Sequence, residues 1–117
     1  MKILFILNDP PYGTERVYNA LRLALALRKS APETDIAVFL MADAVTAARK
    51  GQKTPDGYYN IGLMVKGVVA GKGRLLLCGT CMDARGLAEA DLIEGARRST
   101  MAELAEETLG ADKVLVF

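Results

Sequence analysis

The chain has 117 residues, of which 51% are hydrophobic and 25% are charged, and its formal net charge is +1. Such a length suffices for one stable core, so we expect residues 1–117 to form a single domain. The balanced charge gives no electrostatic basis for binding nucleic acid or an anionic membrane, and the apolar runs are too short to span a bilayer. The sequence contains no histidine, the commonest metal ligand and the usual catalytic base near neutral pH.

The chain begins with a predicted strand and a long predicted helix. Residues 2–8 form an apolar run without helical periodicity, which indicates a buried strand. Two prolines follow and no small-residue cleavage site does, so we do not expect a signal peptide. Thr14 is placed to cap a helix that runs to about residue 29, and Glu15 in the first turn suits the positive end of its dipole.

The middle of the chain continues the alternation of predicted strands and helices. Residues 36–41 predict a second strand, and residues 44–50 predict a short helix. A polar loop over residues 52–57 precedes residues 58–70, whose apolar side chains have the spacing of an amphipathic helix. Residues 74–78 then predict a third, buried strand.

The last third adds a strand, a helix and a final strand. Residues 91–96 predict a short fourth strand, and Thr100 with Glu103 predicts a capping box for the helix that follows. Residues 113–117 form a last apolar strand. Strands that alternate with helices in this way indicate an α/β fold with a parallel sheet and helices on both faces.

The segment around the two cysteines is the most informative part of the chain. An apolar run ends at Cys78, a turn containing Gly79 follows, and Cys81 comes three positions after Cys78. In α/β proteins, sites are built where parallel strands end. A thiol there can approach backbone N–H groups, which favour the reactive thiolate. We therefore predict sulfur or redox chemistry, with Cys78 as the nucleophilic or persulfide-carrying thiol and Cys81 as a resolving or assisting thiol.

Two other interpretations of the cysteines stay open. Cys78 can be a small core residue at a strand end, since free cysteine is among the most buried residue types. A structural zinc ion needs four Cys or His ligands and this chain has two, so we expect no metal unless subunits share ligands. Closely spaced cysteines in a chain with no predicted signal peptide favour a reducing, cytoplasmic setting.

The loop after the first strand supplies a second group of candidate site residues. We expect this loop to lie near the cysteine loop, where its helix N-terminus and a basic side chain either hold an anion or steady a thiolate, or serve only to shape the turn. No dinucleotide-binding glycine pattern follows the first strand, and we expect no cofactor. The candidate supporting residues in this loop are Asp9, Tyr12, Thr14, Glu15 and Arg16.

Other polar residues have two interpretations each. The segment 52–59, which includes Lys53, either covers a pocket or is a solvated connection. Asp83 and Arg85 either tune the thiols or pair with each other at the surface, where such pairs contribute little. The sequence Arg97–Arg98 predicts a solvated turn.

Five segments, taken in order, match the pattern of a known family. They are NDPPYGTER (8–16), VFLMADAV (38–45), GQKTP (51–55), CGTCMDARGL (78–87) and ADKVLVF (111–117). Together they resemble the DsrE-like family of small sulfur-relay (DsrE/DsrF-type) proteins, in particular its YchN-like branch. The resemblance spans nearly the whole chain.

The resemblance implies a three-layer α/β/α sandwich with a mainly parallel sheet of about five strands, in which the last strand lies beside the first. In the sulfur-relay members a cysteine after the third strand carries a persulfide, and Cys78 matches it; Cys81 has no counterpart there. Three functions remain open: a cytoplasmic sulfur carrier with protein donors and acceptors, a dithiol redox protein using both cysteines, and a non-catalytic oligomeric module that binds a small ligand.

Assembly into a homo-oligomer is also expected. Apolar side chains cover more of the first helix than packing on one sheet face requires, and soluble monomers rarely expose large apolar patches. The resemblance implies a homotrimer or homohexamer. We expect the cysteine loop near a subunit boundary, where the segment 52–59 of a neighbouring subunit covers it.

Overall fold

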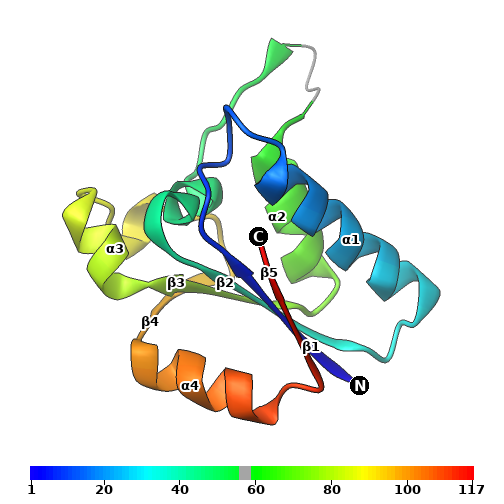
Figure 1. The fold of residues 1–117 in the computed structure, drawn as a ribbon. Helices are drawn as coiled ribbons and strands as arrows, with labels where there is room; N and C mark the ends of the chain where they lie inside the picture. Colours follow the sequence, from blue (N-terminus) through cyan, green and yellow to red (C-terminus); the bar gives the residue numbers. More distant parts are fainter. Residues whose placement is uncertain (56–58) are drawn as a thin grey trace.

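Five strands pair in parallel into one sheet in the computed structural model, which describes residues 1–55 and 59–117 (Figure 1). The order across the sheet is β4-β3-β2-β1-β5, so the last strand lies beside the first, as expected. The strands are β1 (Lys2–Leu7), β2 (Asp35–Leu40), β3 (Arg74–Cys78), β4 (Ala96–Ser99) and β5 (Lys113–Val116). The predicted α/β architecture with a parallel sheet is confirmed.

Helices cover both faces of this sheet. Figure 1 shows α1 and α2 on one face, α4 on the other, and α3 beyond the end of β3. The helices are α1 (Arg16–Ser30), α2 (Ile61–Ala70), α3 (Gly79–Ala84) and α4 (Met101–Gly110), with short 3-10 helices η1 (Ala42–Ala48) and η3 (Glu89–Asp91). None of the helices in the described part of the chain has the length and apolar character needed to cross a membrane.

Alternation along the strands divides the buried side chains between two clusters. Phe5 and Val38, which are neighbours on β1 and β2, belong to the large cluster under α1 and α2. Phe39 and Leu76, which are neighbours on β2 and β3, belong to a smaller cluster that includes Leu104 of α4. Burying each such side chain contributes about 1.5–3 kcal/mol to folding, so both faces of the sheet support the fold.

The predicted fourth strand at residues 91–96 is wrong. Leu92 and Ile93 are buried in the large cluster without forming a strand, and the strand β4 begins only at Ala96. Arg97 and Arg98 therefore lie in a strand and not in a turn. An edge strand has a neighbour on one side only and tolerates exposed charges, so an apolar run does not mark it.

Two helix starts also differ from the prediction. Helix α1 begins at Arg16, and the hydroxyl of Thr14 donates to the Asp9 carboxylate at 3.4 Å instead of capping the helix. Helix α2 begins at Ile61, where the Asn60 side chain accepts the Leu63 N–H at 3.2 Å. The expected start of this helix at residue 58 lies outside the described residues.

The predicted short helix after the second strand is a 3-10 helix over residues 42–48 and not 44–50. At the start of α4, the Thr100 hydroxyl accepts the Glu103 N–H at 3.1 Å, as the capping motif predicts. The carboxylate of Glu103 instead accepts two hydrogen bonds from Arg97, at 2.9 and 2.6 Å. Helix α4 is thereby fixed to the edge strand β4.

Candidate functional site

The two cysteines meet at the carboxyl end of β3. Cys78 is the last residue of this strand and also the N-cap of α3, which begins at the next residue. The segment expected to be a turn is thus the first turn of a helix. The backbone N–H of Cys81 donates to the Sγ of Cys78 at 3.4 Å. Both thiols are free and partly buried, so the fold brings together the two residues that the sequence singled out.

The thiol of Cys81 is held from the neighbouring strand. Its Sγ accepts the backbone N–H of Ala42 at 3.2 Å, and Ala42 is the first residue of η1, just after β2. Ala42 has a φ of 49°, a left-handed conformation that residues with a Cβ seldom adopt. This uncommon backbone geometry, found where Ala42 contacts the thiol, is of the kind that clusters at functional sites.

The two thiols influence each other electrostatically. Burial raises the pKa of the Cys81 thiol, and its interaction with Cys78 adds to the rise. The Ala42 N–H and the charge of Arg85 act in the opposite direction without cancelling it. Cys81 therefore favours its protonated thiol form near neutral pH, which makes it a poor first nucleophile.

Asp83 and Arg85 do not pair with each other. The guanidinium of Arg85 pairs with the carboxylate of Asp43 on η1 at 2.9 Å and donates to the Cys81 carbonyl oxygen at 3.1 Å. Asp83 accepts two hydrogen bonds from Arg98 on β4, at 2.7 and 2.9 Å, which lower the pKa of its carboxyl group. These two pairs fix α3 to the segments on either side of it.

Arg98 is a residue of this site that the sequence did not reveal. Its guanidinium lies so close to Gly79 that a Cβ there would be 2.7 Å from Cζ, so only glycine fits at position 79 without displacing it. The Asp83 carboxylate raises the pKa of Arg98, and the charges of Glu89 and Cys78 add to the rise. The pairing of Cys78 with Ser99 across β3 and β4 places Arg98 here, and this register is the signal that could have found it.

The loop after β1 makes its polar contacts elsewhere. Asp9 pairs with Arg16 at 3.5 Å, and the Tyr12 hydroxyl donates to Gln52 at 2.6 Å. The carboxylate of Glu15 accepts the hydroxyl of Tyr59 at 3.0 Å. Strand β2 separates β1 from β3, and within residues 1–55 and 59–117 no hydrogen bond or ion pair joins this loop to either cysteine. The expected contact between the loop after β1 and the cysteine segment is therefore not among these hydrogen bonds and ion pairs.

The segment expected to cover a pocket is fixed at its start. The Gln52 side chain donates to the carbonyl oxygens of Ala47 and Arg49 at 2.8 and 2.9 Å. Lys53 is exposed, and no polar contact among the described residues ties it to the cysteines. Residues 56–58 of this segment lie outside the described residues.

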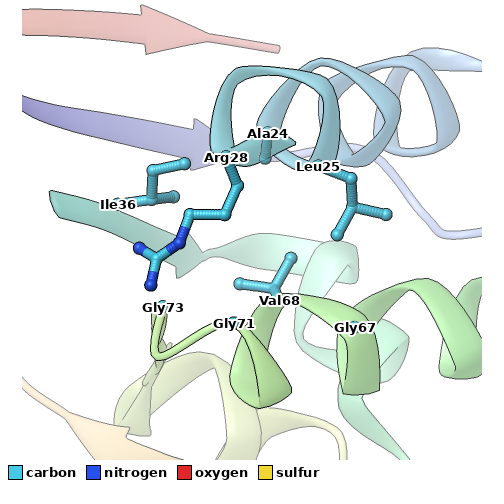
Figure 2. Close-up of a pocket in the computed structure, with 8 residues that line it drawn as sticks. All are labelled: Ala24, Leu25, Arg28, Ile36, Gly67, Val68, Gly71 and Gly73. Atoms are coloured by element: carbon cyan, nitrogen blue, oxygen red, sulfur yellow. The ribbon is translucent and has the colours of Figure 1, made fainter. Parts of the chain in front are cut away.

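A small cavity elsewhere in the fold is not suited to a ligand. Figure 2 shows it between α1 and α2, near Ile36 at the start of β2, with the Arg28 side chain extending across it. Its free volume is about 10 Å³, which holds at most one water molecule. Because Ile36 is at the amino end of the sheet and Cys78 at the carboxyl end, this cavity is separate from the thiols.

A broad depression flanks the cysteine segment at the surface. It has a volume of about 440 Å³, and Asp83 and Arg98 are among the residues that line it. Within the described residues, no group of three or more Cys, Asp or Glu side chains is arranged to hold a metal ion. Among the described residues, the groups next to the cysteines are thus two thiols, backbone N–H groups and the ion pairs of Asp83 and Arg85.

Comparison with known proteins places the chain in a family. The family model described as "DsrE/DsrF-like family" matches residues 1–117. The chain belongs to the DsrE/DsrF-like family. Among relatives in this family, Protein YchN of Escherichia coli K12 is 47% identical over 116 residues, which are 99% of this chain and 98% of that protein. The uncharacterized protein MJ0989 of Methanocaldococcus jannaschii is 38% identical over 117 residues and covers both chains completely.

Solved structures agree with this assignment. The crystal structure of the YchN protein from E. coli superposes with a TM-score of 0.95 and covers 100% of this chain and 99% of that one. Protein MTH1491 of Methanobacterium thermoautotrophicum has a TM-score of 0.79 at 17% identity and covers 97% of each chain, which shows a shared fold. The predicted family and fold are confirmed.

Proposed function

We propose that this chain is a sulfur carrier in which Cys78 receives a sulfane sulfur as a persulfide. The Cys78 thiolate attacks the outer sulfur of a donor persulfide, and the donor leaves as a thiol. A thiol of an acceptor protein then takes the outer sulfur from Cys78. The observation that carries the proposal is the position of Cys78 at the end of β3, with its Sγ accepting the Cys81 N–H.

Two features of the site support this chemistry. A hydrogen bond from a backbone N–H favours the charged form of a thiol, and the thiolate is the nucleophile. The Arg98 guanidinium lies beside Gly79, the residue that follows Cys78. The surface depression beside Arg98 gives a partner protein a place to approach. The DsrE/DsrF-like family membership is consistent with a relay role.

The proposed compartment is the cytoplasm, and the proposed partners are protein donors and acceptors of sulfur. The proposed carrier needs a reduced Cys78 thiol, which is the state that a reducing compartment maintains. The step requires no cofactor, because the thiol itself carries the transferred atom. The sulfur donor and acceptor are thus defined by their chemistry, as a protein persulfide and a protein thiol.

The Cys78→Ser variant is expected to lose sulfur loading completely, because serine offers no thiolate to accept the atom. The protein is incubated with glutathione persulfide and desalted, and its intact mass is then measured. Wild type and the Cys81→Ser variant should gain the mass of one sulfur atom. Thr80→Ala is the matched control, since Thr80 is exposed between the two cysteines. An adduct that survives Cys78→Ser but not Cys81→Ser would contradict the assignment.

A dithiol redox protein is the second candidate, and the hydrogen bond from the Cys81 amide to the Cys78 thiol favours it. Cysteines three positions apart at a helix start can cycle between a dithiol and a disulfide. A reduction potential in the range of cytosolic dithiol proteins would support this function. A potential far more oxidising would contradict it.

We also propose that the chain assembles into a homotrimer or homohexamer through the outer surface of α1 and α2. Leu23 is 39% exposed and Leu63 is 58% exposed on this surface. A groove of about 530 Å³ is lined by Leu23, Leu25 and Met64 among other residues. Apolar burial contributes about 25 cal/mol per Å², so an interface of roughly 1,600 Å² can outweigh the entropy cost of association.

Light scattering at micromolar concentration is expected to give a mass of three or six chains. Changing Leu23 and Leu63 together to glutamate should shift the protein toward smaller species, because each charge would be buried at the interface. Leu109→Glu on α4 is the control, since this residue is 88% exposed on the other face of the sheet. A monomeric wild type would contradict the proposed assembly.

A further inference from the structure

The two thiols of the site lie close to each other. The Cys81 backbone N–H lies 3.4 Å from the Cys78 Sγ, within one helical turn. Cys78 is the N-cap of α3 and Cys81 lies in its first turn, the Cys-X-X-Cys arrangement in which dithiol proteins form a disulfide. The two thiols are therefore placed to react with each other.

The side chain of Cys81 is held in place before any reaction. Its Sγ accepts the Ala42 N–H at 3.2 Å and packs against the large core cluster. Cys78 packs instead against the smaller cluster on the α4 face of the sheet. The second thiol thus lies close to the first, although the two side chains pack against different clusters.

The second thiol is held in reserve next to Cys78. Burial and Cys78 together raise the pKa of Cys81, so this thiol is mostly protonated near neutral pH. Once Cys78 carries a persulfide, the only other thiol of the chain is one helical turn away. Its attack is slow because little of it is thiolate.

We infer that Cys81 discharges the Cys78 persulfide, which releases its outer sulfur as sulfide and leaves a Cys78–Cys81 disulfide. This inference rests on the proposed carrier function. The Cys81 sulfur attacks the Cys78 Sγ, so a bond forms between the two protein sulfurs while the bond from Cys78 to the outer sulfur breaks. Cys81 first loses its proton to solvent, and the outer sulfur then leaves with the electron pair and its own hydrogen, reduced to hydrosulfide. The two cysteines are together oxidised by two electrons.

This step limits the lifetime of the loaded carrier. A persulfide that meets an acceptor thiol in time passes on its sulfur, and one that does not is cleared as sulfide. The resulting disulfide cannot accept sulfur until a dithiol reductant restores both thiols. Cys81 therefore makes loading dependent both on acceptor supply and on reductant.

The test follows the loaded protein over time. Wild type, Cys81→Ser, Cys81→Ala and the control Thr80→Ala are loaded with glutathione persulfide, desalted without reductant and sampled by intact mass. Released sulfide is trapped with monobromobimane. Wild type and Thr80→Ala should lose the sulfur adduct, release one sulfide per adduct and end two hydrogens lighter than the reduced chain. Both Cys81 variants should keep the adduct at least about tenfold longer and release no sulfide at that rate.

The outcomes separate this inference from the carrier function. If the adduct decays equally fast in wild type and in both Cys81 variants, the discharge step is wrong and the carrier function stands. If neither Cys81 variant ever gains a sulfur atom, the carrier function itself is wrong. Dithiothreitol added at the end should restore loading of wild type, and a failure to do so would contradict the disulfide product.

Discussion

Replacing Phe39 with alanine is expected to lower the free energy of unfolding by about 3–5 kcal/mol. Phe39 is 1% exposed on the central strand β2 and faces α4. Its cluster has only five buried residues and one covering helix among the described elements, so little remains to fill the cavity. The loss is a large part of the 5–15 kcal/mol that stabilises typical domains.

Urea denaturation followed by circular dichroism, at one fixed protein concentration, measures this loss. Leu109→Ala is the matched control, because Leu109 lies on α4 and is 88% exposed. Its effect should stay within about 0.5 kcal/mol. A loss below about 1 kcal/mol for Phe39→Ala would mean that α4 moves to fill the cavity and that this face of the sheet is not well packed.

The parts of the fold that bury apolar side chains were predictable from the sequence. Strands β1, β2 and β3 are buried on both faces, and their continuous apolar runs mark them directly. Helix α4 was predicted because Thr100 caps it and apolar residues follow at helical spacing. In these segments local pattern and tertiary packing agree.

The edge of the sheet was not predictable in the same way. Strand β4 reads Ala96-Arg97-Arg98-Ser99, and its stability comes from pairing with β3 and from ion pairs with Asp83 and Glu103. The apolar pair Leu92 and Ile93 looked like a strand but fills the core as a loop. Hydrophobic pattern reports burial, and burial does not require a strand.

The candidate site was predictable in its thiols and not in its supporting groups. Cys78 and Cys81 are close in sequence, and the helix start between them brings them together. Ala42 follows β2 and Arg98 lies on β4, and both come next to the cysteine segment only through the strand order β4-β3-β2. The loop after β1 was expected at the site because it also follows a strand, but β2 lies between the two.

The lifetime of the Cys78 persulfide is expected to fall steeply as pH rises, if Cys81 performs the discharge. The pKa of Cys81 lies above its ordinary value because of burial and Cys78. Below that pKa, the thiolate fraction of Cys81 rises about tenfold per pH unit, and the rate of attack follows it. Between about pH 6 and about pH 8 the adduct should therefore decay up to about a hundredfold faster.

The groups around Cys81 also affect the pH dependence of the persulfide decay. Arg85 favours the thiolate and is itself paired with Asp43 on η1, while the Ala42 N–H supports the thiolate from the same side. Arg85→Gln should slow the decay at every pH and leave the steepness unchanged, because the same thiol still titrates. Cys81→Ser should remove the steep dependence altogether. Time courses of intact mass at several pH values measure both effects. A flat profile in wild type, or the same profile in Cys81→Ser, would show that the persulfide is lost by a route that does not involve Cys81.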